Sequence, residues 1–353
     1  MIYKLGELFC GPGGLALGAL SSKIKVEGRI NSIEHAWATD FDQDSCDTYH
    51  KNIAKNQQDS VICEDVRKLN ISSLSPIDAF AFGFPCNDFS IVGEQKGVEG
   101  KYGPLYSYGV KIINYFNPLF FVAENVGGLS SANQGMAFKK ILFDLEKSGK
   151  GYNLSVNLYK AEEYGIPQTR HRIIIVGIRK DLKKQFEVPK PTHLGKFVSV
   201  KEALENPKIL STAHNHEFKR ISKLVEERLS YIKPGQNVWN AKLPAHLMLK
   251  ETNTKISQIY KRLDPDKPSY TITGSGGGGT HGYHYKENRP LTNRERARIQ
   301  SFPDNFLFNG SIESVRRQIG MAVPPRLSQV VFKHILLKLA NKSYPSVAQN
   351  INL

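Results

Sequence analysis

Short apolar runs alternate with segments of helical spacing along the first half of the chain. The runs predict strands at residues 5–9, in the stretch ending at Asp40, and at Val61–Cys63, 77–82 and 119–126. Helices are predicted behind Gly14 and at Gln43–Asn52, 105–116 and Met136–Lys147. Because strand and helix alternate, the pattern favours an α/β fold with a doubly wound, mostly parallel sheet.

Two adjacent strand patterns follow at residues 155–179 and predict a hairpin around a turn at Gly165 and Pro167. Arg170 and Arg172 alternate along the second strand, so we expect them on one face and His171 on the other. Two arginines on one face suit the orientation of a carboxylate or contact with a phosphate. An ordinary salt-bridged edge is the alternative.

The second half has weaker periodicity from Val188 onward, with many Lys, Arg, Asn and His residues. We therefore expect three parts: a first domain at 1–187, a smaller domain at 188–311, and a segment at 312–353 that returns to complete the first. Thr292 and Glu295 predict a capped helix that stops before Pro303, and residues 328–339 predict a buried helix. The glycine-rich segment 274–279 indicates either a loop laid against a bulky partner or a loose surface excursion.

Composition and charge narrow the choice of partners and location. The formal net charge is +15, from 48 Lys and Arg against 33 Asp and Glu, which favours a polyanionic partner. A generally basic proteome is the alternative. No apolar run is long enough to span a membrane and no secretory pattern opens the chain, so we expect a cytoplasmic protein. The four cysteines form no CxxC pair, and neither a disulfide framework nor a metal site is expected.

Candidate chemistry gathers where the predicted strands end. Cys86 follows the strand at 77–82, and Pro85 stops strand pairing in front of it. A thiol at a strand tip, before a turn whose amides lower its pKa, suits a nucleophile; a small core residue is the alternative. Three carboxylates also end strands and are expected on the same rim, or as solvated strand ends: Asp40, Asp65 and Glu124.

A glycine turn lies between the first strand and the first helix, at Gly11, Gly13 and Gly14. Glycines there let a nucleotide-like ligand approach the backbone. The spacing is not GxGxxG, so the turn alone is a weak signal. A nicotinamide-dependent dehydrogenase is a poor alternative, because it leaves the PC and ENV stretches unexplained.

Six motifs occur in the order and at separations typical of one family, the DNA cytosine-5 methyltransferases: ELFCGPGG, PCNDFS, ENV, QTRHR, RPLTNRERARIQSFP and GMAVPP. The chain resembles this family, in its bacterial restriction-modification type, over nearly its whole length except residues 188–288. The resemblance implies a Rossmann-like methyltransferase fold with a smaller, variable target-recognition domain at 188–311. It also implies double-stranded DNA as substrate. The recognition sequence cannot be read, because the variable segment matches no motif.

By this resemblance, Cys86 would add to carbon 6 of a flipped-out cytosine and so activate carbon 5 for methylation. Glu124 would relieve the resulting negative charge at ring nitrogen 3. Arg172 would contact the carbonyl oxygen of the base, and Arg170 would help to orient Glu124. No residue is assigned as the base that removes the carbon 5 proton.

The resemblance further implies S-adenosylmethionine as methyl donor, S-adenosylhomocysteine as product and no metal. Asp40 would bind the ribose, Phe41 would cover the adenine and Asp65 would bind its amino group. The full set of expected donor contacts is Phe9, Gly11, Gly13, Gly14, Asp40, Phe41, Asp65, Pro85, Leu105 and Val323. Ser90 and Gln168 are the expected DNA contacts. Two positions depart from the family pattern, Glu7 in place of its usual Asp and Met321 in place of its usual Asn.

The predicted function is methylation of a cytosine within a specific DNA sequence, as the protective partner of a restriction endonuclease acting on the same site. Two alternatives remain: a transfer-RNA cytosine-5 methyltransferase with the same residues, and a non-catalytic DNA-binding regulator that keeps the fold. The long basic variable segment favours DNA over transfer RNA. The three functional side chains Cys86, Glu124 and Arg172 favour an enzyme over a regulator.

Overall fold

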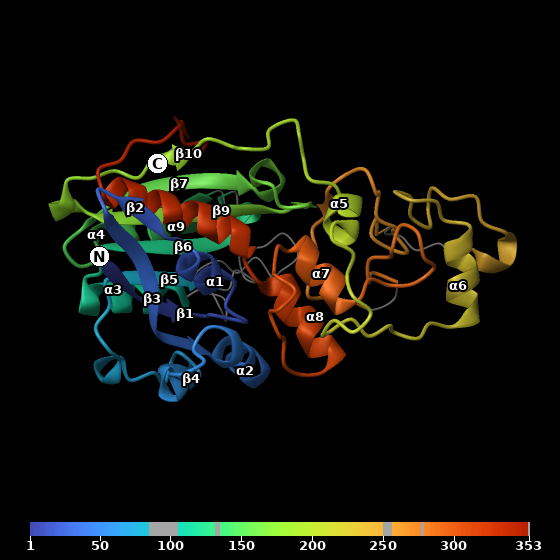
Figure 1. Cartoon of the computed structure of the whole chain (residues 1–353), viewed down its shortest axis with the longest axis horizontal. Coiled ribbons are helices and arrows are strands. Elements are labelled where there is room, and N and C mark those ends of the chain that lie inside the picture. Colours follow the sequence, from blue (N-terminus) through green and yellow to red (C-terminus); the bar gives the residue numbers. More distant parts are fainter. Residues whose placement is uncertain (85–104, 131–134, 250–255, 277–278, 352–353) are drawn as a thin grey trace. The chain divides into compact units, whose positions relative to one another are not determined.

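The computed structural model describes residues 1–84, 105–130, 135–249, 256–276 and 279–351. It divides into two compact units (Figure 1). Unit 1 comprises Met1–Lys160, His171–Pro191 and Val323–Leu353, and unit 2 comprises Ala161–Arg170 and Thr192–Ala322. The boundaries at 191 and 322 differ from the expected 187 and 311, because the helix before Val323 packs within unit 2. In the described ranges no helix is long and apolar enough to cross a bilayer.

The large sheet of unit 1 has the order β2-β3-β1-β5-β6-β9-β7, and β4 pairs with β3 at a branch. Neighbours β3/β4, β1/β3, β1/β5 and β5/β6 are parallel, whereas β2/β3, β6/β9 and β9/β7 are antiparallel. The sheet is therefore mostly parallel across its functional centre, as predicted. Its strands are β1 (Ile2–Leu8), β2 (Ile24–Val26), β3 (Arg29–Asp40), β4 (Val61–Cys63), β5 (Ala79–Gly83), β6 (Phe120–Val126), β7 (Tyr152–Lys160) and β9 (His171–Arg179).

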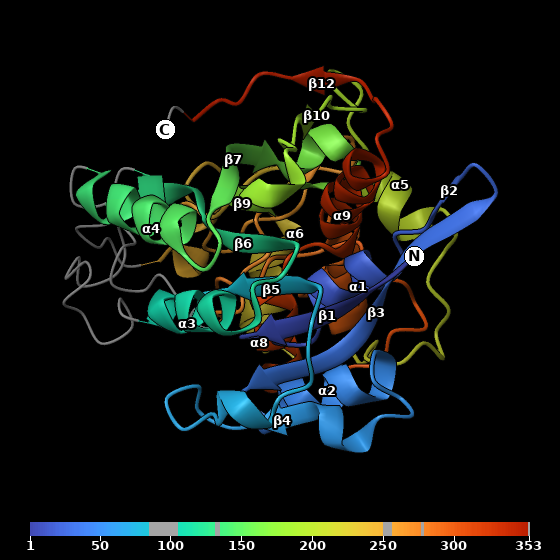
Figure 2. The ribbon, with the colours of Figure 1, turned by 90° about the vertical axis from the view of Figure 1, so that its left-hand side faces the viewer.

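Helices cover both faces of this sheet (Figure 2). Strand β6 shows how the sequence arranges this, because its successive side chains point to opposite faces. Phe120 packs edge-on against Phe332 of α9, with ring centroids 6.3 Å apart. Phe121 faces the other way, into a core shared with Ile112 of α3 and Ile141 of α4. The helices of unit 1 are α1 (Gly14–Leu20), α2 (Gln43–Asn52), α3 (Tyr106–Phe116), α4 (Met136–Lys147) and α9 (Pro325–Leu339).

The C-terminal helix α9 returns to unit 1 by close packing on α1. A β-carbon added to Gly18 would lie 2.4 Å from the carbonyl oxygen of Pro325, so only glycine allows this approach. Ser328 Oγ donates a hydrogen bond to the carbonyl of Leu15 at 2.6 Å. The C-terminal segment therefore packs on unit 1, and Gly18 of α1 makes room for it. A small two-stranded sheet, β10 (Val188–Pro189) with β12 (Ser346–Val347), lies further along the same chain end.

Unit 2 has few regular elements: β8 (Gln168–Thr169), β11 (Ser269–Tyr270), α5 (Val200–Glu205), α6 (Lys223–Ser230), α7 (Asn293–Ile299) and α8 (Ile312–Met321). Alongside backbone–backbone hydrogen bonds, arginine side chains connect its segments. Arg262 donates to the carbonyls of Leu229, Ile232, His284 and Tyr285 at 2.8–3.1 Å. Arg294 donates to those of His214, Pro303 and Phe306. The predicted capping box of α7 is present, with Thr292 and Glu295 bonded reciprocally.

The predicted hairpin at 155–179 is only partly correct. Strands β7 and β9 do pair antiparallel, but the pairing ends at Lys160 and His171. Residues 161–170 leave the sheet and join unit 2, where β8 pairs in parallel with β11. Arg170 therefore does not lie on the β9 strand with Arg172, and the expected shared face is wrong. The reason is this excursion, which strand alternation cannot reveal.

The glycine-rich segment packs on α8 where it is described, which neither sequence interpretation anticipated. A β-carbon on Gly274 would lie 3.0 Å from the carbonyl oxygen of Arg317, and one on Gly320 would lie 1.9 Å from the nitrogen of Gly274. These glycines permit two backbones to touch. Residues 277–278 lie outside the described ranges.

Candidate active site

The centre of the sheet supplies the rim on which the candidate residues meet. Strand β1 has β3 on one side and β5 on the other, so the chain order reverses at the carboxyl end of β1. In open α/β sheets, ligands bind in the crevice that such a reversal opens. The glycine turn, Asp40 and the end of β5 all belong to this rim.

The glycine turn combines left-handed backbone with open space. Phe9, Gly11 and Gly13 have positive φ angles of 54°, 50° and 94°. A β-carbon added to Gly11 would meet no described atom within 4 Å. Gly14 has a different purpose, because its added β-carbon would lie 2.2 Å from the carbonyl oxygen of Val323. Gly11 is thus open to a ligand, whereas Gly14 fixes the contact between α1 and the chain entering α9.

Asp40, at the end of β3, ties the glycine turn to the next loop. Its carboxylate accepts the backbone N–H of Gly11 at 2.8 Å and that of Asp42 at 3.0 Å. Burial raises the pKa of Asp40, while these two N–H groups act in the opposite direction. The adjacent Phe41 side chain is 78% exposed. An exposed aromatic ring beside an anchored carboxylate offers a stacking surface at the rim.

Asp65 follows β4 and is held by a neighbouring arginine. Arg67 Nε lies 2.9 Å from Asp65 Oδ1, and its Nη2 contacts the other carboxylate oxygen. These hydrogen bonds lower the pKa of Asp65 to about 2, so the group is ionised at neutral pH. Leu105, just before α3, is half-buried against the core of unit 1, and Val323 is buried.

Glu124 has the most specific surroundings of the predicted catalytic residues. It pairs in register with Gly83, the last residue of β5, and a β-carbon on Gly83 would lie 3.2 Å from Glu124 Oε2. Arg172, near the start of β9, places its Nε 2.8 Å from Glu124 Oε1. The side chain of Glu124 is 11% exposed and that of Arg172 is 13% exposed. A desolvated ion pair therefore fixes the carboxylate beside the strand that leads to the PC motif.

Asn125 is a site residue that the sequence reasoning missed. Its Nδ2 donates to the carbonyl of Phe84 at 3.1 Å, and its Oδ1 accepts from the N–H of Val126. The buried amide thus holds the chain at the residue before Pro85. The ENV triplet was the available signal, but only its glutamate received a role. Pro85, Cys86 and Ser90 lie outside the described residues.

Two predicted residues belong to unit 2 and are buried there. Arg170, 1% exposed, donates to the carbonyls of Ile272, Gly320 and Ala322 at 2.9–3.0 Å. Gln168 is fully buried, and its amide bonds to Gln300 Oε1 and to the N–H of Ile272. The amide of Gln168 is thus engaged inside unit 2, and the DNA contact expected for this residue stays a prediction.

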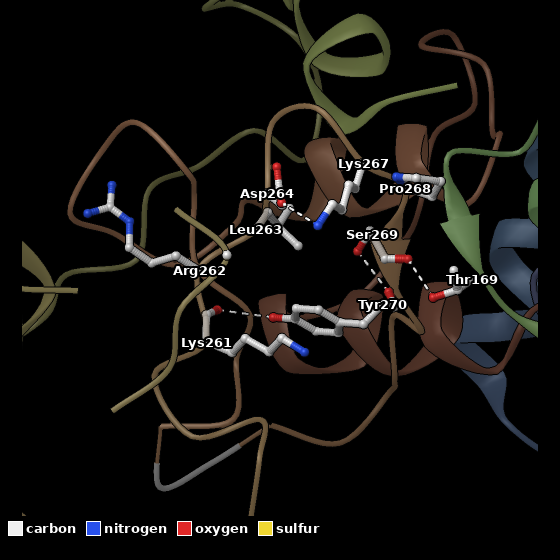
Figure 3. Close-up of a pocket in the computed structure, with 10 residues that line it drawn as sticks. Thr169, Lys261, Arg262, Leu263, Asp264, Lys267, Pro268, Ser269 and Tyr270 are labelled. Atoms are coloured by element: carbon white, nitrogen blue, oxygen red, sulfur yellow. Dashed lines mark hydrogen bonds and ion pairs between the residues drawn. The ribbon is translucent and has the colours of Figure 1, made fainter. Parts of the chain in front are cut away.

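A polar pocket of about 280 Å³ also lies within unit 2, beside β8 and β11 (Figure 3). Tyr270 projects across it and donates to the carbonyl of Lys261 at 3.1 Å. Lys267 lies at its rim, paired with Asp264 at 3.4 Å. These mutual contacts satisfy much of the lining, and none of the residues predicted as catalytic lines the pocket.

Comparison with known proteins identifies the family of this chain. Residues 3–337 match the family described as C-5 cytosine-specific DNA methylase. The chain belongs to this family. It is 57% identical to the Type II methyltransferase M.BbvI of Brevibacillus brevis, over 98% of this chain and 94% of that protein. It is 40% identical to the Type II methyltransferase M.NgoFVII of Neisseria gonorrhoeae, over 94% of this chain and 86% of that protein.

Solved methyltransferase structures share the fold of this C-5 cytosine methylase. A putative DNA modification methyltransferase encoded within an E. coli prophage superposes with a TM-score of 0.73 at 24% identity, covering 96% of this chain and 99% of that one. The Entamoeba histolytica methyltransferase EhMeth gives 0.65 at 16% identity, over 97% and 98% of the two chains. The α/β methyltransferase fold predicted from the sequence is confirmed.

The rim of this methylase fits the S-adenosylmethionine that its family uses. Gly11 leaves open space at a backbone that only glycine adopts easily, and Phe41 offers a ring next to it. Across the described ranges, no group of three or more His, Cys, Asp or Glu side chains is placed to hold a metal ion.

The two departures from the family pattern have different surroundings. Glu7 is buried beneath the glycine turn, where it accepts a hydrogen bond from Tyr49 Oη at 3.1 Å. Tyr49 in turn contacts His35 Nδ1 at 3.3 Å, and His35 Nε2 lies 2.8 Å from Ser60 Oγ. Burial raises the pKa of Glu7 to about 8. Met321, by contrast, is 56% exposed at the end of α8.

Proposed function

We propose that this chain methylates carbon 5 of a cytosine within a specific double-stranded DNA sequence, through transient covalent attachment of Cys86 to carbon 6. The observation that carries the mechanism is the register of β5 against β6, which sets Glu124 beside Gly83. Cys86 stands three positions after Gly83 in the sequence. The strand that leads to the nucleophile is therefore fixed directly to the acid.

The first step is addition. The Cys86 thiolate forms a bond to carbon 6. The π electrons of the carbon 5–carbon 6 double bond are displaced into the rest of the ring, which gains negative charge. Glu124 relieves that charge by hydrogen bonding or proton transfer at nitrogen 3, and Arg172 steadies both the carboxylate and the carbonyl oxygen of the base. The existing 2.8 Å contact between Arg172 and Glu124 supports this division of roles.

The second step uses carbon 5, now electron-rich, to take the methyl group. When bound, S-adenosylmethionine would supply that group from its sulfonium sulfur, with S-adenosylhomocysteine as the product. Phe9, Gly11, Gly13, Asp40, Phe41, Asp65, Pro85, Leu105 and Val323 are the proposed contacts that hold it, and Gly14 supports them by packing. A base then removes the carbon 5 proton, and elimination of the Cys86 thiolate restores the aromatic ring.

The target must leave the DNA helix, which costs a few kcal/mol of stacking and pairing. The net charge of +15 supports recovery of part of this cost through contacts with phosphates. Ser90 is a proposed phosphate contact. We assign target recognition to unit 2, and the proposed setting is the cytoplasm, at the nucleoid, with a restriction endonuclease that cuts the same sequence.

Bisulfite sequencing of DNA from cells that express this chain tests the proposal. We expect one short sequence to be methylated at a single cytosine throughout the genome. Uptake of labelled methyl groups by purified DNA and by transfer RNA, compared side by side, excludes the RNA alternative if only DNA is labelled. Unmodified DNA despite soluble, DNA-binding protein would contradict the proposal and favour a regulator.

A further inference from the structure

Two buried arginines of unit 2 lack a carboxylate partner in the described ranges and also have few hydrogen-bond acceptors. Arg316 of α8 is 9% exposed and Arg296 of α7 is 4% exposed. Neither forms an ion pair with a carboxylate anywhere in the described ranges of the chain. Arg262 and Arg294 differ from them, since each fills its fork with three or more backbone carbonyls.

Arg316 lies against the described start of the glycine-rich segment. Its Nη2 donates to the carbonyl of Gly276 at 3.3 Å, and a β-carbon on Gly276 would lie 2.8 Å from Arg316 Cζ. Its Nη1 is 3.5 Å from His281 Nδ1. Its Nε is buried and has no hydrogen-bond partner among the residues that the structure describes. Two long contacts and one unsatisfied donor offset little of the free-energy cost of removing this guanidinium from water.

Arg296 approaches the same place from the next helix, because it donates to the carbonyl of His281. Burial, followed by the charges of Arg316 and Arg296, lowers the pKa of His281 to about 4, so this imidazole is neutral at pH 7. His281 can then accept from Arg316 without adding a third charge. The nearest acid that acts on the imidazole, Glu313, is engaged with Lys219 at 3.0 Å.

We propose that Arg316, Arg296 and His281, with the backbone at Gly276, form a binding site for one phosphate of the DNA backbone. A guanidinium fork binds phosphate oxygens in pairs, and an entering anion would satisfy Arg316 Nε and offset both charges. This site rests on the proposed function, since it supposes that the substrate is DNA. It contacts no base, so it contributes affinity and position without sequence preference.

Among the described residues, no acid of the chain substitutes for this anion. Glu295 neighbours Arg296 in the sequence, but it is held by Arg289 at 2.8 Å and by the backbone of Thr292. Positive charge is therefore left over at this point of unit 2. A side chain at position 276 would collide with the guanidinium of Arg316, so glycine is what permits this close approach.

The test measures DNA affinity over a range of salt concentrations with the full chain, after wild type has been shown to methylate the same duplex. Arg316→Met should weaken binding about tenfold at physiological salt, and the slope of log K against log salt should fall by about 0.9, the value for one phosphate. The loss should be equal for specific and unrelated duplexes. Lys201→Gln, at an exposed lysine of α5 in the same unit, is the matched control and should leave the slope unchanged.

Single methylphosphonate substitutions along the duplex test the site from the DNA side and require no folded Arg316→Met protein. Wild type should lose about tenfold at one backbone position, and Arg316→Lys, which keeps charge but not the fork, should lose less there. The inference is overturned if no neutralised phosphate is coupled to residue 316, or if Arg316→Met folds and keeps the wild-type slope. Wild-type methylation in that case would leave the proposed function standing.

Discussion

Units 1 and 2 satisfy their buried backbone in different ways. Unit 1 pairs most of its strands in one large sheet, so its interior is filled by apolar side chains such as Phe80, Phe82 and Phe121. In the described part of unit 2 the strands are two residues long, and arginines donate to carbonyls there in addition to the backbone N–H groups. A ladder of backbone bonds is insensitive to individual side chains, whereas an arginine fork depends on one residue.

This difference explains why the sequence was informative in one unit and poor in the other. Strand and helix periodicity arises when a regular element buries one face, and the rim residues Asp40 and Glu124 could be placed because they end such elements. In unit 2 the organising residues are Arg170, Arg262 and Arg294, which a sequence presents as surface charges. Their burial follows from long-range contacts with carbonyls, which no local pattern encodes.

The two tryptophans allow each unit to be followed separately. Trp37 is buried in unit 1, with its indole N–H bonded to the carbonyl of Ser75 at 2.9 Å. Trp239 lies in unit 2, bonded to the carbonyl of Ile256 at 3.0 Å. Variants that keep one tryptophan therefore report the unfolding of one unit by fluorescence in denaturant.

The largest effect is expected in the core of unit 1. Phe121→Ala removes a buried ring that packs on Tyr152, with centroids 5.0 Å apart, and should cost about 4 kcal/mol of unfolding free energy. The Trp37 transition should move to lower denaturant. An equal shift of the Trp239 transition would show that the units unfold together.

A slightly smaller effect is expected from the equivalent change in unit 2. Arg262→Met keeps the apolar stem of the side chain but removes the guanidinium, which leaves five backbone carbonyls without their donor, at a cost of about 3 kcal/mol. The Trp239 transition should move while that of Trp37 stays. The exposed Arg220→Met serves as control. Equal stability of the two variants would contradict the role given to arginine forks.

Next comes the catalytic acid of unit 1. Glu124→Gln keeps the shape but removes the charge that pairs with Arg172, and it cannot exchange a proton with nitrogen 3. The rate of methyl transfer in single turnover should fall about 100-fold or more, with little change in DNA affinity. A loss confined to DNA binding would instead indicate a structural role for Glu124.

The last prediction concerns pH. The folded-state pKa of Glu7 is about 8, above that of an exposed glutamate, so the folded state binds the extra proton between these values. Stability of unit 1 should therefore fall as pH rises from about 5 to about 8, with a slope of at most about 1.4 kcal/mol per pH unit. In the Glu7→Gln variant, the denaturant midpoint of the Trp37 transition should change less with pH over that range. An unchanged pH profile would show that Glu7 is ionised in the folded protein.

The sequence and the structure contribute different parts of the candidate site. The PC motif was recognised from its residues, while the structure contributes the surroundings that receive it, namely Asn125 holding Phe84 and Glu124 beside Gly83. The excursion at 161–170 was missed because its strand-like composition continues that of β7 and β9. The two sources are complementary at this site.

The central claim is that Cys86 bonds covalently to the base, and trapping on DNA with 5-fluorocytosine at the target position measures this directly. Fluorine at carbon 5 cannot leave as a proton does, so the adduct should persist after methyl transfer. With donor present, wild type should form a denaturation-resistant complex whose DNA maps to the peptide containing Cys86, and Cys86→Ser should bind the DNA but form none. A stable adduct with the Ser variant, or its absence in wild type that methylates ordinary DNA, would contradict the account.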